Sequence, residues 1–287
     1  MNLRLTMCAL LALVPAVAPA QQARMLPVGD AMIHYEVRGS GEPVVFLHGW
    51  SQDLTIWDRE VEALAPQYRI IRLDRRGYGR STGHADPTAD PADLRILLDS
   101  LGIRRATIVG LSAGAGVAAS FGMAFPDRVE RMVLYGLGPL EGFPGAESMR
   151  AGMTSFANAV RSGGLDSLWT AMMTSGIFWR PPGTPVPEPP DSWRRYNGKD
   201  LTDPQPPSGK VPLASWHRIE SLSMPVLLLQ GEHDMPPALA IADSITRRLP
   251  NARRVVIPDA GHGAHFDQPD RFLAALREFL SSTPIRR

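Results

Sequence analysis

The sequence predicts an α/β fold, in which helices cover a parallel sheet and one inserted segment interrupts the pattern. Short apolar runs rich in β-branched residues alternate with helical segments from residue 25 to 134, and the alternation resumes from 226 to 280. Alternation at this spacing is typical of parallel strands joined by crossover helices. Between residues 139 and 219 the alternation stops, which indicates an insertion.

The first half of the chain supplies strands and helices in turn. Two or three extended segments come first, and Gly39, Ser40 and Gly41 give the turn signals between the two clearest of them. We expect strands at 32–37 and 44–47, a helix near 58–65, a strand at 69–73, a helix at 91–101, a strand at 106–109, a helix at 113–125 and a strand at 129–134.

The second half repeats this order after the insertion. We expect a strand at 226–229, a helix at 237–249, a strand at 254–257 and a helix at 269–280. The core is therefore assigned to residues 21–138 and 220–287.

Residues 139–219, called the cap below, differ from the core in composition. Helices are expected near 146–160 and 165–174, and six of the ten residues from 181 to 190 are proline, which excludes an ordinary helix or central strand there. A long insertion after a strand end suits a cover over a site. Its large apolar side chains are expected to pack the cap against the core or to contact a substrate: Met149, Met153, Phe156, Trp169, Met172, Met173, Phe178 and Trp179.

The length and charge of the chain fit an ordinary globular protein. With 287 residues, of which 44% are hydrophobic and 21% charged, the chain can bury one large core. Removing residues 1–20 takes away Arg4 and no acidic residue, which leaves 29 basic against 29 acidic residues. This balance gives no indication of nucleic-acid binding.

The N-terminus predicts export. An apolar run from Leu5 to Val17 follows Arg4 and ends in Ala18-Pro19-Ala20, a small-x-small cleavage pattern. The run is too short for a bilayer and Pro15 interrupts it, so we expect a signal peptide over residues 1–20 and a secreted or periplasmic protein without stable membrane insertion. The only cysteine, Cys8, lies inside the run, which excludes thiol chemistry and disulfides in the mature chain.

A candidate nucleophile follows the strand at 106–109. Residues 110–114 form a G-x-S-x-G sequence that leads into a small-residue helix. Such a sharp turn forces the central residue into strained backbone angles, and side chains at Gly110 or Gly114 would collide with neighbouring backbone. Ser112 would stand above the helix N-terminus, where backbone N–H groups and the helix dipole favour negative charge.

A serine nucleophile requires a base, and the base requires an acid that orients it. Both are expected after later strands, in the order serine, acid, histidine. We favour His262, which follows the strand at 254–257 after a short loop, and Asp234, which follows the strand at 226–229. The rivals are His265 for the base, and Glu232 and Asp259 for the acid.

Donors for the developing oxyanion are expected on two backbone segments. The N–H of Ala113 follows the nucleophile, and that of Trp50 follows a strand that ends in a glycine turn. The Trp50 indole is a candidate for lining an acyl pocket, whereas the His48 side chain is expected to pack in the core and stabilise the turn by a hydrogen bond.

Five motifs in this order resemble the α/β-hydrolase superfamily: residues 46–50, 74–81, 110–114, 231–234 and 261–262. The resemblance covers nearly the whole chain after residue 20. It implies a mostly parallel eight-stranded sheet flanked by helices, with an inserted cap. Residues 46–50 and 74–81 also resemble the cofactor-free haloperoxidase and arylesterase branch, which resembles serine esterases that can use peroxide as acyl acceptor. Many members follow the serine with Met-Gly-Gly, where this chain has residues 113–115, Ala-Gly-Ala.

We therefore expect a serine hydrolase, free of metal and cofactor, that acts on a small apolar carboxylic ester or lactone. Ser112, His262 and Asp234 would form the triad, and the N–H groups of Trp50 and Ala113 the oxyanion hole. Aminopeptidase, carbon–carbon bond hydrolase and perhydrolase activities would use the same triad, and a binding receptor would use the pocket without catalysis. An aminopeptidase would need a cap carboxylate for the substrate amine, for which the candidates are Glu141, Glu147, Asp166 and Glu188.

Overall fold

The computed structural model describes residues 22–180 and 183–282. The expected signal peptide and Cys8 lie outside the described residues, and so do Pro181 and Pro182 of the proline-rich stretch. Of the helices in the described ranges, none combines the length and apolar character that a membrane crossing requires.

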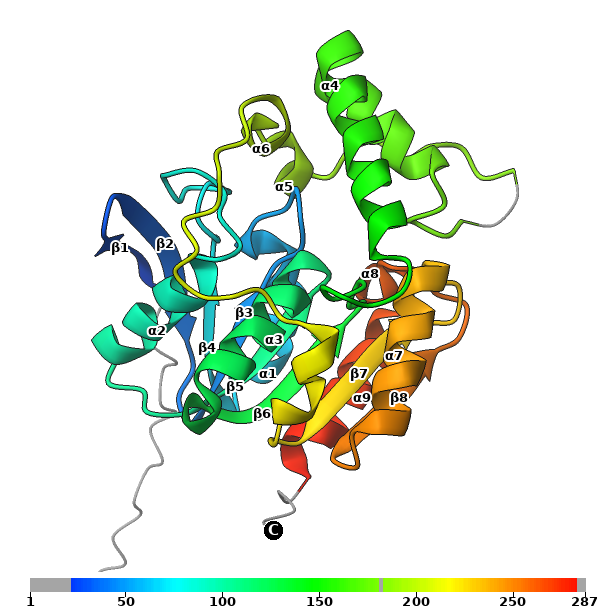
Figure 1. The fold of residues 1–287 in the computed structure, drawn as a ribbon. Coiled ribbons are helices and arrows are strands. Elements are labelled where there is room, and N and C mark those ends of the chain that lie inside the picture. The colour runs from blue at the N-terminus through cyan, green and yellow to red at the C-terminus, as the bar shows by residue number, and fades with distance from the viewer. Residues whose placement is uncertain (1–21, 181–182, 283–287) are drawn as a thin grey trace, which may run out of the picture.

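The predicted sheet is confirmed. In the described part of the chain eight strands form one sheet in the order β1-β2-β4-β3-β5-β6-β7-β8 (Figure 1). β2 pairs antiparallel with β1 and with β4, and the other neighbours are parallel. The strands are β1 Gln22–Val28, β2 Ala31–Arg38, β3 Glu42–Leu47, β4 Tyr68–Leu73, β5 Ala106–Leu111, β6 Val129–Tyr135, β7 Val226–Gly231 and β8 Ala252–Ile257.

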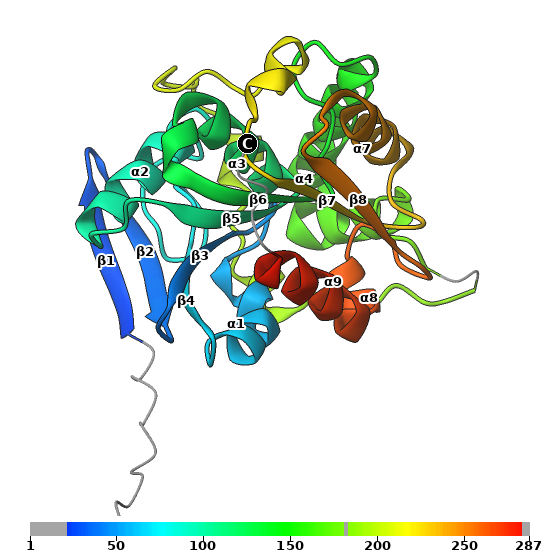
Figure 2. The same ribbon diagram turned by 90° about the horizontal axis from the view of Figure 1, so that it is seen from below.

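Helices cover both faces of the sheet, as Figure 2 shows from below. The apolar cores assign α2, α3 and α7 to one face and α1 and α9 to the other. Alternate residues of the central strands serve the two cores: in β3, Val45 belongs to the first and Val44 to the second. The core helices are α1 Asp58–Leu64, α2 Asp90–Ser100, α3 Ala113–Ala124, α7 Pro236–Arg248, α8 Ala264–Asp267 and α9 Pro269–Ser281, with 3-10 turns η1 Leu54–Trp57, η2 Pro126–Arg128 and η3 Trp216–Ser221.

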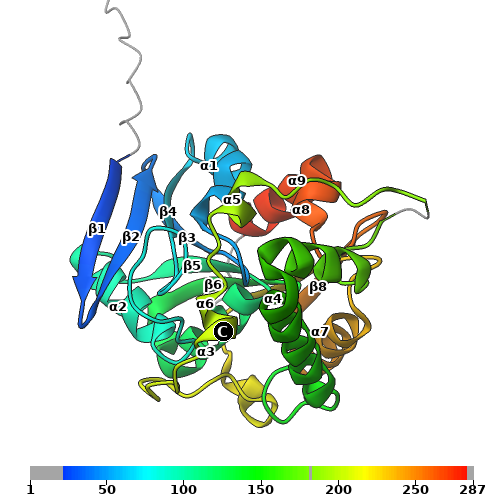
Figure 3. The ribbon, with the colours of Figure 1, turned by 90° about the horizontal axis from the view of Figure 1, so that it is seen from above.

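The cap lies over the core, as Figures 1 and 3 show for α4 Ala146–Thr174, α5 Asp191–Arg194 and α6 Lys199–Thr202. α4 is kinked at Gly163 and Gly164, where the backbone leaves helical angles, so it corresponds to the two helices that the sequence predicts. Residues 184–190 form neither helix nor strand, as their proline content predicts. A small apolar cluster, which includes Phe156 and Trp193, holds the cap together and takes in Tyr78 from the core.

One charged side chain is buried in the second core without a partner. Glu60 of α1 is 1% exposed, and its two carboxylate oxygens have no hydrogen-bond partner among the described residues. Burial raises the pKa of Glu60 to about 7 from an ordinary value of 4.5. The folded protein therefore keeps this proton over a range of pH in which the unfolded chain releases it, and the free energy of unfolding falls as the pH rises from 4.5 to 7.

We predict that Glu60→Gln, which keeps the neutral form at every pH, removes this loss of stability. The variant should match the wild type near pH 4 and exceed its free energy of unfolding by up to about 3 kcal/mol at pH 8. Denaturant unfolding at several pH values measures the difference. Glu62→Gln is the matched control, because Glu62 lies on the same helix and is exposed. A difference that does not change with pH would contradict the buried, protonated state of Glu60.

Candidate active site

The turn between β5 and α3 places Ser112 in a strained conformation. Ser112 has φ 52° and ψ −114°, a backbone region that residues other than glycine rarely adopt. Its N–H donates to Tyr135 O at 2.8 Å and its carbonyl accepts from Ala115 N at 2.9 Å, so both sides of the residue are fixed. The Ser112 side chain lies at the N-terminus of α3.

The glycines of the motif are required because backbone segments touch there. A Cβ at Gly110 would lie 2.3 Å from Gly114 O, and a Cβ at Gly114 would lie 2.5 Å from the carbonyl oxygens of Leu47 and His48. The predicted collisions are thereby confirmed. α3 packs directly against the end of β3, which brings Ser112 next to the loop that carries Trp50.

His262 and Asp234 form a buried pair at the ends of β8 and β7. His262 Nδ1 lies 2.8 Å from Asp234 Oδ1, which also accepts from Met235 N at 2.7 Å. A carboxylate only accepts hydrogen bonds, so Nδ1 is the donor in this contact, and Nε2 is the ring nitrogen that does not contact Asp234. The ring is held from behind by Gly136, where an added Cβ would lie 2.8 Å from His262 Cε1.

Ser112 and His262 line the same cavity, which has a volume of about 630 Å³. Among the hydrogen bonds of the described residues, none joins Ser112 Oγ to His262. Such bonds are often long until a substrate is in place. The cap gives the cavity an apolar wall of Met149, Met153, Phe156, Met172, Ile177 and Phe178.

Trp50 and Ala113, the two expected oxyanion donors, also line this cavity. Neither backbone N–H has an acceptor within the described ranges, so both are free to bind an oxygen. His48 has the structural role that we expected, because its Nδ1 contacts Gly49 O at 2.7 Å and its Nε2 accepts from Arg75 N at 2.9 Å. Burial lowers the pKa of His48 to about 4, so that its ring is neutral at pH 7.

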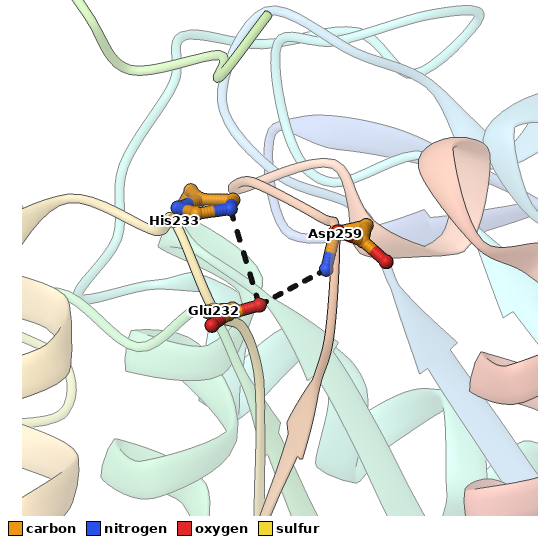
Figure 4. Close-up of side chains that lie close together, drawn as sticks. All are labelled: Glu232, His233 and Asp259. Atoms are coloured by element: carbon orange, nitrogen blue, oxygen red, sulfur yellow. Dashed lines mark hydrogen bonds and ion pairs between the residues drawn. The ribbon is translucent and has the colours of Figure 1, made fainter. Parts of the chain in front are cut away.

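The two rival acids lie elsewhere. Glu232 and Asp259 are exposed beside His233 (Figure 4). None of these three residues belongs to the cavity lining. Glu232 accepts from Asp259 N at 3.2 Å, His233 stacks on Trp179, and Asp259 lies 3.8 Å from Arg271. These three side chains could present metal ligands to solvent, but each already has a partner in the protein.

His265, the rival base, borders the cavity but faces Tyr135. Its Nδ1 lies 2.9 Å from Tyr135 Oη, which donates its own proton to His262 O at 2.8 Å. His265 Nδ1 must therefore be the donor in the first contact. Burial lowers the pKa of His265 to about 3, which keeps the ring neutral. The residue supports the loop that carries His262.

Some residues at the cavity were not singled out from the sequence. Arg75 and Asp90 line it as a buried ion pair at 3.1 Å, and Tyr78 lies beside them with the Arg75 guanidinium 4.8 Å above its ring. Arg75 and Tyr78 belong to the motif at 74–81, which carries a family resemblance but predicts no role for either residue. Asp200 of the cap, which bonds to Trp50, lies in no motif, so nothing in the sequence pointed to it.

Comparisons with known proteins bear on the family and the fold of the chain. A family model described as the alpha/beta hydrolase fold matches residues 42–269. The pimeloyl-[acyl-carrier protein] methyl ester esterase of Nitrosomonas europaea is 28% identical over 253 residues, which cover 85% of this chain and 98% of the relative.

Two solved structures are also similar. A thermophilic esterase from Thermogutta terrifontis has a TM-score of 0.71 and 26% identity and covers 91% of this chain and 98% of its own. The enol-lactonase of Burkholderia xenovorans has a TM-score of 0.74 and 22% identity, and the match covers 90% of this chain and 100% of the enol-lactonase. The second likeness concerns the fold alone.

We predict that Gly136→Ala displaces His262 and slows the reaction of Ser112 with a fluorophosphonate probe by about 10- to 100-fold. Gly136 has φ 57°, so the variant also loses some stability. Gly102→Ala is the matched control, because Gly102 has φ 66° but open space around it. Both variants should lose thermal stability through their positive φ, and Gly136→Ala loses more because of the collision. Labelling that slows equally in both would contradict the role of Gly136.

Proposed function

The chain belongs to the alpha/beta hydrolase fold family, and from this premise we propose that it cleaves a small apolar carboxylic ester or lactone through an acyl-enzyme on Ser112. Relatives of the chain include named esterases, and the protein is a hydrolase. The observation that carries the finer proposal is one cavity lined by both Ser112 and His262, with Asp234 behind the histidine at 2.8 Å.

The geometry supports a two-step mechanism. His262 Nε2 takes the proton of Ser112 as Oγ attacks the carbonyl carbon, and Asp234 stabilises the imidazolium that forms. The negative charge passes to the carbonyl oxygen, which accepts hydrogen bonds from the N–H groups of Trp50 and Ala113. His262 then gives its proton to the departing alcohol oxygen, and water repeats the sequence on the acyl-enzyme.

The cavity favours an uncharged, apolar substrate. Methionine and aromatic side chains of the cap form much of its wall, and methionine adapts to apolar groups of irregular shape. Arg75 and Asp90 in the lining neutralise one another as an ion pair, and Asp86 accepts from Thr88 and Ser208. A lactone is a cyclic ester and would use the same groups.

The aminopeptidase alternative has no support at the cavity. Glu141, Glu147, Asp166 and Glu188 of the cap are absent from its lining. Asp200, a cap carboxylate that bonds to two residues of the cavity lining, accepts three hydrogen bonds from protein groups. An ester or lactone requires no such carboxylate.

We also propose export of the protein, on the pattern of residues 1–20 alone.

We predict that the protein hydrolyses p-nitrophenyl butyrate or a lactone of similar size, and that Ser112→Ala lowers kcat at least about 10³-fold because the nucleophile is lost. Steady-state kinetics on both substrates measure the effect. Ser162→Ala, on an exposed part of the cap, is the control and should keep wild-type rates. Turnover that survives in Ser112→Ala, or none by the folded wild type on either substrate, would contradict the proposal.

A further inference from the structure

One carboxylate of the cap holds the loop that follows β3. Asp200, on α6, accepts hydrogen bonds from Trp50 Nε1 at 2.6 Å, Tyr78 Oη at 3.0 Å and Tyr196 Oη at 2.5 Å. Trp50 and Tyr78 belong to the core and line the cavity, whereas Asp200 and Tyr196 belong to the cap. Hydrogen bonds to a charged acceptor are stronger than neutral ones, and this half-buried carboxylate receives three.

Aromatic residues of the cap enclose the Trp50 indole. Phe156 stacks on it with ring centroids 5.8 Å apart and 16° between planes, and Tyr196 meets it edge-on at 5.8 Å. Tyr196 in turn stacks on Tyr78. The two rings that contact the indole, Phe156 and Tyr196, both belong to the cap. The position of the indole therefore depends on how the cap lies on the core.

The Trp50 backbone lies next to a strained residue. Ser51 has φ 60° and is 1% exposed, and its hydroxyl donates to Trp50 O at 2.6 Å. A non-glycine residue in this region persists only when its surroundings hold it. The peptide that carries the Trp50 N–H is held at its carbonyl end, because Gly49 O contacts His48 Nδ1 at 2.7 Å. The Trp50 N–H itself has no acceptor in the described part of the chain. The bond of the indole to Asp200 adds a second support, from the side chain of Trp50.

We propose that Asp200 is a positioning residue for the oxyanion hole, which acts by holding Trp50 so that its backbone N–H points at the carbonyl oxygen of the substrate. The cap thus contributes to the chemical step as well as to the apolar wall, because α6 carries one of the groups that hold the oxyanion donor. This inference rests on the proposed function, in which the Trp50 N–H stabilises the transition state.

Asp200→Ala removes all three hydrogen bonds and should lower kcat about 10- to 100-fold, which is at most the effect of losing a whole oxyanion donor. KM should change less than about 3-fold, because substrate binding does not depend on the oxyanion donor. Asp203→Ala is the matched control with wild-type kinetics, because Asp203 ends the same helix and is exposed. Binding of a boronic acid that forms a tetrahedral adduct on Ser112 should weaken by the same factor as kcat, while the inhibition constant of the product acid stays the same.

Asp200→Asn should restore most of the rate. An indole N–H only donates, whereas a tyrosine hydroxyl also accepts. The asparagine oxygen can therefore face Trp50 and Tyr78 at the Oδ2 position, while its amide N–H donates to Tyr196. If the negative charge of Asp200 mattered and its three hydrogen bonds did not, Asp200→Asn would be as impaired as Asp200→Ala. That result would contradict the inference.

Trp50→Phe keeps the backbone N–H and loses the bond to Asp200, so it should reproduce the fall in kcat, and the double variant with Asp200→Ala should lose no more than either single one. This arm keeps the test decisive if Asp200→Ala does not fold. Full kcat in Trp50→Phe, additive losses in the double variant, or a rise in KM that accounts for the whole effect would overturn the inference. Turnover that depends on Ser112 but not on Asp200 would overturn it while leaving the proposed function intact.

Discussion

The close approach of α3 to β3 is the constraint on which the candidate site depends. Gly114 brings the first turn of the helix against the carbonyl oxygens of Leu47 and His48, where a Cβ would lie 2.5 Å from each. The same approach forces Ser112 into its strained angles and sets its side chain beside the loop that carries Trp50. A larger side chain at Gly114 would move the proposed nucleophile away from the loop that carries Trp50, one of the two proposed oxyanion donors.

The rest of the site is held by contacts between distant segments. Asp234 fixes the ring of His262, Gly136 limits where that ring can move, and Tyr135 bonds to the His262 carbonyl. On the other side of the cavity Asp200 binds the Trp50 indole. The core thus presents the reacting groups from the ends of its strands, while the cap supplies the apolar wall and one carboxylate that reaches the oxyanion loop.

Local signals in the sequence predict the sheet, the main helices and the glycine collisions at the turn of Ser112, because periodicity and backbone sterics are local. They also favoured Asp234 and His262, which the fold brings to 2.8 Å, although their catalytic role stays a prediction. The bond between Trp50 and Asp200 joins residues 150 positions apart, and Asp200 lies in a four-residue helix without a motif. Gly136 resembles any other turn glycine until His262 is packed against it. Such contacts follow from tertiary packing, which a local sequence pattern does not predict.

The most direct test of the account is to identify the covalent intermediate. The protein is mixed with an ester whose acyl-enzyme breaks down slowly, quenched in acid during the first turnovers, and measured by intact mass spectrometry and peptide mapping. The account predicts one added acyl group per chain, on the peptide that holds Ser112, and a slower return to the free mass in Asp234→Asn. Ester turnover with no adduct, or an adduct on another residue, would contradict a mechanism centred on Ser112.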